Sequence, residues 1–312
     1  RQILRAITSG DPEVAARAMF QHVTESKERM LRTEARLAVP SARRDGANGA
    51  SGTDGDPLKP RLYALVVGVG AYPSDSIPAL DFPAKDARDF ATELKNQSGR
   101  LYREVNVRLL EDAGATREAV IDGLDWLRRQ ATANDLAVLF LAGHGINDSS
   151  NRYYFVPVNA DPARLRSTAI PNGDIAEALQ ALPAKVLAFL DTCHAGNVLG
   201  NTRQRNLAVG MHGDINRLVN ELSSAENGVV VFASSTGRET SQESPDWNNG
   251  AFTKALVEGL AGRADFNGDN AVSLNELNLY VADRVKQLTN GDQHANMIRP
   301  DSIRDFPFAV MK

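Results

Sequence analysis

Short apolar runs alternate with helix-like segments from about residue 61 onward, and this alternation limits the fold more than any other feature of the chain. A strand buried on both faces is continuously apolar, and a parallel neighbour needs a crossover connection, usually a helix. The pattern therefore predicts an α/β fold with a mostly parallel central sheet covered by helices on both faces. We expect strands near 62–69, 104–109, 136–142 and 185–190, and helices near 83–96, 116–131 and 173–182.

The N-terminal part of the chain differs from this pattern. Asp11-Pro12-Glu13 opens a stretch with no further glycine or proline before Pro40, which predicts a helix over 11–38 within an N-terminal helical segment, 1–40. Residues 41–60 are rich in Gly, Ser, Asp and Ala, a composition typical of a flexible linker. The main domain is therefore expected to span 61–312.

The second half of this domain begins after a polar, loop-like insert, 197–227. Beyond the insert we expect one more buried strand at 228–234 and helices near 251–261 and 275–288.

Charge and hydropathy exclude two classes of partner. Lys and Arg are scattered among Asp and Glu, and the formal net charge is −4, so no basic stripe is available for nucleic acid or an anionic membrane. The apolar runs are far shorter than the roughly 20 residues that cross a bilayer. The chain begins at Arg1 with no methionine and no apolar signal region, so we expect an excised fragment or processed product. Its single cysteine excludes an internal disulfide and favours a reducing compartment, which predicts a cytoplasmic location.

Reactive side chains follow two of the apolar runs. Gly143-His144-Gly145 follows one, and Asp191-Thr192-Cys193-His194-Ala195-Gly196 follows the other. Ligands of open α/β sheets bind beyond the carboxyl ends of the strands, where both segments are expected. A thiol becomes a strong nucleophile when a histidine promotes the thiolate, which predicts a Cys193–His144 pair.

The glycines beside His144 allow close approach of a substrate, and the amides of Gly145 and Cys193 could donate to a developing oxyanion. The alternative is a buried cysteine that packs as a small hydrophobe beside a histidine satisfied within the core. We assign His194 a structural role, and we name no third catalytic residue.

The two motifs resemble the paired His and Cys motifs of the caspase, metacaspase and paracaspase superfamily, nearest to the metacaspase or orthocaspase branch. The His–Cys separation of 49 residues is similar to the spacing of about 50 known for caspases. Supporting resemblance extends over about 62–308 and includes Ala233-Ser234-Ser235 and Gly250-Ala251-Phe252-Thr253. The resemblance implies a caspase-like fold with a large-subunit-like part (62–200) and a small-subunit-like part (228–312).

The resemblance also implies a cysteine endopeptidase that works through an acyl-enzyme, with Ser234 among the substrate-binding residues. Caspases use arginines to bind a substrate aspartate, but this chain has Asp191 two residues before Cys193 and no arginine between Gly70 and Lys85. Asp86 is the second acid expected at the pocket, which predicts cleavage after Arg or Lys. The alternative is that Asp86 favours the first turn of its helix and Asp191 hydrogen-bonds the loop backbone.

Residues 265–276 have the calcium-loop spacing of an EF-hand. Oxygen ligands would come from Asp265, Asn267, Asp269, Ser273 and Glu276, with the backbone carbonyl of Ala271. Position 6 of the loop holds Asn270 in place of glycine, and no second loop is present. The alternative to a Ca²⁺ site is a turn that keeps this geometry through side-chain hydrogen bonds alone.

Two other functions compete with peptidase activity. One is a catalytically silent caspase-like scaffold or interaction module, against which the intact Cys193 and His144 argue. The other is a hydrolase or transferase that uses the same pair on a small molecule. If the enzyme prefers basic residues, it could also cut itself near Arg203 or Arg205 in the polar insert.

Overall fold

The computed structural model describes residues 58–150, 152–194, 216–223, 228–235 and 239–311, apart from the side chains of 193, 194, 216 and 217. The expected N-terminal helix, nearly all of the linker, and Arg203 and Arg205 lie outside the described residues. No helix in the described part of the chain is long and apolar enough to cross a membrane.

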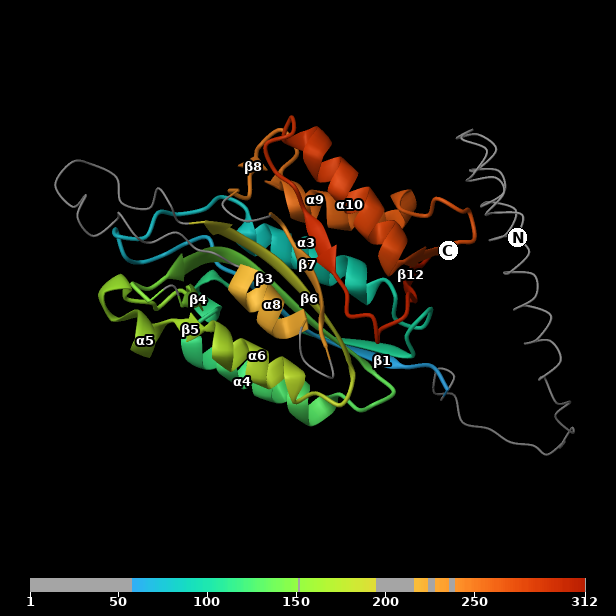
Figure 1. Cartoon of the computed structure of the whole chain (residues 1–312), viewed down its shortest axis with the longest axis horizontal. Helices are drawn as coiled ribbons and strands as arrows, with labels where there is room; N and C mark the ends of the chain where they lie inside the picture. The colour runs from blue at the N-terminus through green and yellow to red at the C-terminus, as the bar shows by residue number, and fades with distance from the viewer. Residues whose placement is uncertain (1–57, 151, 195–215, 224–227, 236–238, 312) are drawn as a thin grey trace, which may run out of the picture. The chain divides into compact units, whose positions relative to one another are not determined.

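An eight-stranded sheet forms the centre of the domain (Figure 1). Six strands lie in the order β11-β7-β6-β3-β1-β2, and β4 and β5 extend the sheet beside the end of β3. All pairs from β2 to β7 in this order are parallel, and β11 is antiparallel to β7. The strands are β1 (Arg61–Gly68), β2 (Glu104–Glu111), β3 (Leu136–Asn147), β4 (Tyr153–Phe155), β5 (Ile170–Pro171), β6 (Lys185–His194), β7 (Val230–Ala233) and β11 (Asn296–Ile298).

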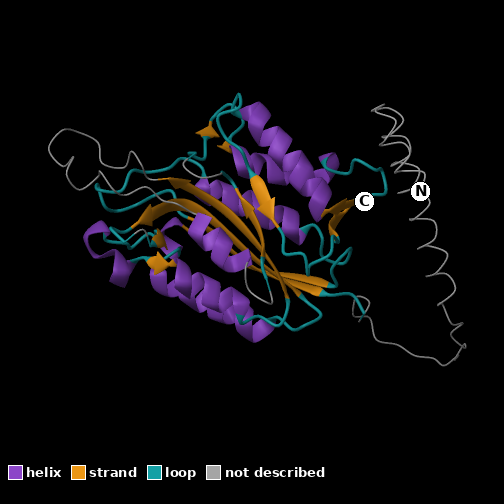
Figure 2. Ribbon diagram, viewed as in Figure 1, coloured by secondary structure: helices purple, strands orange, loops and turns teal. Residues whose placement is uncertain are grey.

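Helices cover both faces of this sheet (Figure 2), which confirms the expected α/β architecture. Those on one face are α3 (Pro83–Lys95), α9 (Ala251–Glu258) and α10 (Leu274–Leu288), and those on the other are α4 (Arg117–Gln130), α6 (Asn172–Gln180) and α8 (Asn216–Ser223) (Figure 1). The smaller elements are α5 (Leu165–Thr168), a β8–β9 hairpin (Glu243–Ser244 and Asn249–Gly250), and the β10–β12 pair (Ala271–Ser273 and Pro307–Val310).

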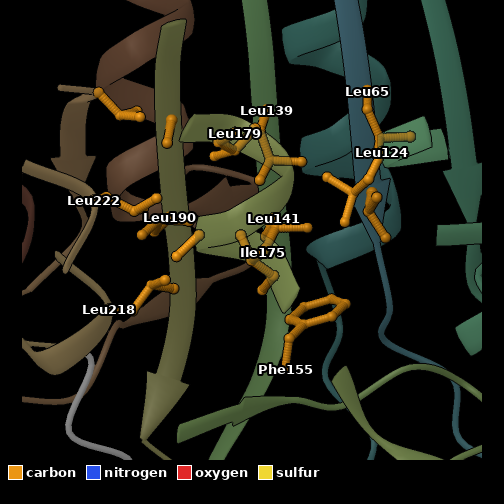
Figure 3. Close-up of a cluster of buried hydrophobic side chains, with 14 of the residues drawn as sticks. Leu65, Leu124, Leu139, Leu141, Phe155, Ile175, Leu179, Leu190, Leu218 and Leu222 are labelled. Atoms are coloured by element: carbon orange, nitrogen blue, oxygen red, sulfur yellow. The ribbon is translucent and has the colours of Figure 1, made fainter. Parts of the chain in front are cut away.

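The period of two along each strand divides the core into two layers. Leu65 on β1 belongs to the cluster that includes side chains of α4, α6 and α8 (Figure 3), while Val66 belongs to the cluster that includes side chains of α3, α9 and α10. The second layer contains a row of rings in which Phe189 stacks on Phe232 at 4.9 Å and on Phe308 at 5.7 Å. Because every central strand is apolar on both faces, the sheet registers are strongly fixed.

The strand order also locates the functional edge of the sheet. The chain passes from β1 through α3 to β2 on one side, and then through α4 to β3 on the other side of β1. Ligands of open α/β sheets bind at such a switch point, outside the carboxyl ends of the strands. The loop after β1, residues 69–82, and the end of β3 flank this point.

Three local expectations are wrong. The strand expected to end at residue 142 continues to Asn147, because its last residues pair with β4 and β6. The insert expected to be loop-like contains α8, which packs on the sheet through Leu218 and Leu222. The helix expected over 251–261 is α-helical only to Glu258, and a π-helical turn, Gly259–Arg263, follows it.

Candidate active site

The pairing of β3 with β6 places His144 beside Cys193. The two residues are Cα partners in the parallel register, and neighbouring strands lie about 4.8 Å apart. The side chains of Cys193 and of His194 lie outside the described residues. The backbone therefore brings together the two positions that the sequence motifs singled out.

His144 is buried and held in one tautomer. Its Nε2 lies 2.8 Å from the carbonyl oxygen of Pro78, which can only accept, so Nε2 carries the proton of the neutral ring. Nδ1 is buried and has no hydrogen-bond partner among the described side chains. Burial lowers the pKa of His144, and the Pro78 hydrogen bond opposes this only in part. The exposed fraction of His144 is only 3%.

Tyr72 also contacts this histidine. Its hydroxyl accepts a hydrogen bond from the backbone N–H of His144 at 3.3 Å and donates to the carbonyl of Val156 at 3.2 Å. The Tyr72 and His144 rings are 5.3 Å apart. Ring and backbone of the histidine are thus fixed from the same loop, 69–82, that carries Pro78.

The glycines around His144 are required by close packing inside the protein. Gly143 has φ +144°, a conformation that L side chains rarely adopt. A Cβ at Gly145 would lie 2.5 Å from the ring of Tyr153, whose hydroxyl donates to Thr192 Oγ1 at 2.9 Å. The oxyanion role of the Gly145 amide stays a prediction.

Asp86 belongs to the first turn of α3. Its buried carboxylate contacts the start of α9. Its Oδ1 accepts from Asn249 Nδ2 at 2.8 Å, and the Gly250 N–H lies 3.1 and 3.2 Å from its two oxygens. Lys85, its neighbour in sequence, pairs instead with Asp89 at 2.5 Å. Asp86 thus contacts the second half of the domain and is not restricted to the first turn of its own helix.

Asp191 is buried near the end of β6, two residues before Cys193. Its Oδ1 accepts from Ser241 Oγ at 3.0 Å, and its Oδ2 accepts from Thr253 Oγ1 at 2.8 Å. Ser234 is also buried, and it hydrogen-bonds to Ser241, which donates to Asp191. Its direct role in substrate binding stays a prediction.

The two carboxylates converge on Gly250. A Cβ built on this glycine would lie 3.0 Å from Asp86 Oδ2 and 3.2 Å from Asp191 Oδ2. Burial raises the pKa of Asp86 to about 8, with a further contribution from the charge of Asp191. Burial also raises the pKa of Asp191 to about 6, opposed by its hydroxyl donors and increased by the charge of Glu243. The pair therefore holds about one proton at neutral pH.

The EF-hand-like loop keeps its shape through its own hydrogen bonds. Asp265 accepts backbone N–H groups of residues 268, 269 and 270, and Ser273 and Glu276 form a capping box at the start of α10. Asn270 takes the left-handed conformation, with φ +65°. Among the described residues, no group of three or more His, Cys, Asp or Glu side chains is arranged to hold a metal. The strand within this loop, β10, pairs with β12, which is not part of a second EF-hand-like loop.

Sequence reasoning missed the groups that hold the predicted residues. Pro78 acts through its carbonyl, which no residue type signals, and Tyr72 lies in a loop without a motif. Asn249 and Ser241 are distant in sequence from the acids they contact. Only Gly250 and Thr253 stood in a segment that the sequence had singled out.

These features agree with the relationship of the chain to known proteins. The family model described as the caspase domain matches residues 61–307, so the chain belongs to the caspase-domain family, which is generally a family of cysteine peptidases. No curated protein sequence matches the chain.

Solved structures share the fold, and two of them illustrate the similarity. Protein GSU0716 from Geobacter sulfurreducens superposes with a TM-score of 0.58 at 20% identity, over 81% of this chain and 100% of that one. The initiator caspase Dronc of Drosophila superposes with a TM-score of 0.52 at 10% identity, over 81% of this chain and 84% of that one. The caspase-like fold expected from the sequence is thereby confirmed.

The buried acids predict a pH-dependent stability. An unfolded Asp loses its proton near pH 4, whereas Asp86 keeps its proton up to about pH 8, so folding is favoured at low pH and loses this contribution as pH rises from about 4 to 8. Asp86→Asn removes the titration and is expected to unfold at a higher temperature than wild type at pH 8. The difference should shrink toward pH 5. Melting curves between pH 5 and 8 measure it, and a parallel pH dependence in both proteins would contradict the assignment.

Calcium binding stays a prediction, and we expect weak, millimolar affinity because Ser273 and Glu276 already cap α10. Calorimetry and melting temperature with and without millimolar Ca²⁺ measure it, with Asp265→Ala as the non-binding variant and Mg²⁺ as the competing ion. If wild type shows no heat of Ca²⁺ binding and no shift in melting temperature, the correct alternative is a turn held by side-chain hydrogen bonds alone.

Proposed function

We propose that this protein is a cysteine endopeptidase of the metacaspase type that cleaves peptide bonds after Arg or Lys. Cys193 is the nucleophile, His144 is the general base and acid, and Asp86 and Asp191 bind the basic side chain before the cleaved bond. Protein or peptide chains are the substrates, as the family relationship implies.

The chemistry follows from the state of His144. Its unprotonated Nδ1 accepts the thiol proton, and the sulfur attacks the substrate carbonyl carbon. The tetrahedral oxyanion is held by the amides of Gly145 and Cys193. His144 then donates the proton to the leaving amine, which departs and leaves a thioester. Water, deprotonated by His144, attacks the thioester and releases the acid and the free thiol.

Convergence of two buried carboxylates on Gly250 is the observation that supports the specificity most. Burial raises the pKa of Asp86, and the charge of Asp191 raises it further, because two buried carboxylates repel each other. A guanidinium placed between them would gain charge-assisted hydrogen bonds from both, while a substrate carboxylate would be repelled. The glycine leaves this space open, because any Cβ would lie against both acids.

The catalytic pair is tested by two single variants. Cys193→Ala and His144→Ala are each expected to lower turnover of fluorogenic Arg peptides to less than a few per cent of wild type while keeping the folded circular-dichroism spectrum. Turnover well above that level in either variant would show that the pair is wrongly assigned. The same proteins report self-cleavage, since new termini after Arg203 or Arg205 should appear by mass spectrometry in wild type and not in Cys193→Ala.

The acidic pocket is tested with matched substrates that end in Arg or in citrulline, its neutral isostere. Asp86→Asn and Asp191→Asn are each expected to lower kcat/KM for Arg by more than tenfold, because a buried charged pair contributes about 2–5 kcal/mol. Gly250→Ala is expected to lower it as well, because its Cβ would lie against both acids. The preference of wild type for Arg over citrulline should rise between pH 5.5 and 8.5, as the acids ionise. Wild-type cleavage after Asp, or equal turnover of Arg and citrulline substrates, would exclude the acidic pocket.

A further inference from the structure

Glu243 links the two parts of the candidate active site. It lies on β8, where it is the antiparallel partner of Gly250 on β9. The hairpin that places Gly250 between the two acids therefore presents Glu243 from its opposite strand. The charge of Glu243 is also close enough to Asp191 to contribute to its raised pKa.

The Glu243 carboxylate caps helix α3 from more than 160 residues away. Its Oε1 accepts the N–H of Asp81 at 2.9 Å, and its Oε2 accepts the N–H of Phe82 at 3.3 Å. Phe82 is the N-cap of α3 and supplies no side-chain cap of its own. A carboxylate at this end satisfies free backbone donors and interacts favourably with the helix dipole.

The same contact fixes the loop that orients His144. Pro78, which accepts the His144 Nε2 hydrogen bond, lies only three residues before Asp81. The other end of this loop is held by Asp112, whose Oδ1 accepts the N–H groups of Gly70 and Ala71 at 2.8 and 3.0 Å. The loop thus has one carboxylate anchor at each end, and Glu243 is the anchor that comes from the pocket hairpin.

We propose that Glu243 is a positioning residue that ties the β8–β9 hairpin to the loop of Pro78, and so holds His144 in its working orientation beside the pocket. The inference rests on the proposed function for the roles of His144 and Cys193. Glu243 acts through the backbone N–H groups of Asp81 and Phe82.

Alkylation of Cys193 by iodoacetamide tests this role without using the specificity pocket. The chain has one cysteine, so the rate constant of a folded variant reports that thiol alone. Glu243→Met keeps the length of the side chain and removes both acceptors. We expect alkylation at neutral pH to slow at least fivefold, with a similar loss in kcat for an Arg peptide. Glu243→Gln, which keeps one carbonyl acceptor, should recover at least half of both rates.

Glu239→Met is the matched control. Glu239 is another partly buried carboxylate of the same segment and also accepts hydrogen bonds, from the backbone N–H and the ring of His294. It has no contact with the loop of Pro78 among the hydrogen bonds of the described residues, so its alkylation rate and kcat should stay within twofold of wild type. Alkylation of Glu243→Met within twofold of wild type would overturn the inference, as would an equal loss in Glu239→Met.

Amide hydrogen exchange keeps the inference testable if Glu243→Met does not fold. In wild type, the amides of Asp81 and Phe82 should be protected, and Glu243→Gln should exchange them faster while leaving the Gly70 and Ala71 amides unchanged. Exchange of the Asp81 and Phe82 amides at the rate of an unstructured peptide in wild type would overturn the inference. If wild type fails to prefer Arg over citrulline but Glu243→Met still slows alkylation, the proposed specificity fails and the role of Glu243 stands.

Discussion

The parallel pairing of β3 with β6 is the contact on which the rest of the site depends. Both strands are buried on both faces, so their register is fixed by packing against helices on each side of the sheet. In this register His144 is the Cα partner of Cys193. A slip of one residue would pair His144 with Thr192 or His194 and would turn every side chain of the strand to the other face. The placement of His144 beside Cys193 is therefore a consequence of core packing that starts eight residues earlier, at Leu136 on β3 and Lys185 on β6.

The second constraint is the free-energy cost of burying two carboxylates in one place. Each acid has polar donors that offset part of this cost: the amide of Asn249 and the N–H of Gly250 for Asp86, and two hydroxyls for Asp191. The pKa values of both acids stay raised, which shows that the effect of burial is larger than the effect of these donors. A site in which the folded protein alone does not satisfy the charges is typical of ligand binding, and in the proposed function the missing charge is supplied by the substrate.

The sequence predicted the long strands of the sheet and singled out the two positions, His144 and Cys193, that the register brings together. Other features were missed for physical reasons. Strands such as β3 and β6 can be predicted from the sequence because burial on both faces makes them continuously apolar. The carboxyl ends of parallel strands lie at one edge of the sheet, so the location of the site can be predicted as well. The β8–β9 hairpin has strands of two residues, which are too short for any periodicity. The role of the Pro78 carbonyl could not be predicted from the sequence, because every residue carries the same backbone acceptor. The capping of α3 by Glu243 joins residues whose proximity depends on the finished fold.

Contacts between the two parts of the domain also bear on the self-cleavage that we propose near Arg203 or Arg205. These positions fall in sequence between β6 and β7, which pair directly within the sheet. Phe189 on β6 stacks on Phe232 of β7, Asn249 donates to Asp86 and Asp89, and Glu243 caps α3. Every one of these contacts is non-covalent and is independent of the connecting segment. A cut in that segment would therefore leave the sheet, the acidic pair and the His144 loop assembled, because the free energy that holds them lies in the core and the hairpin.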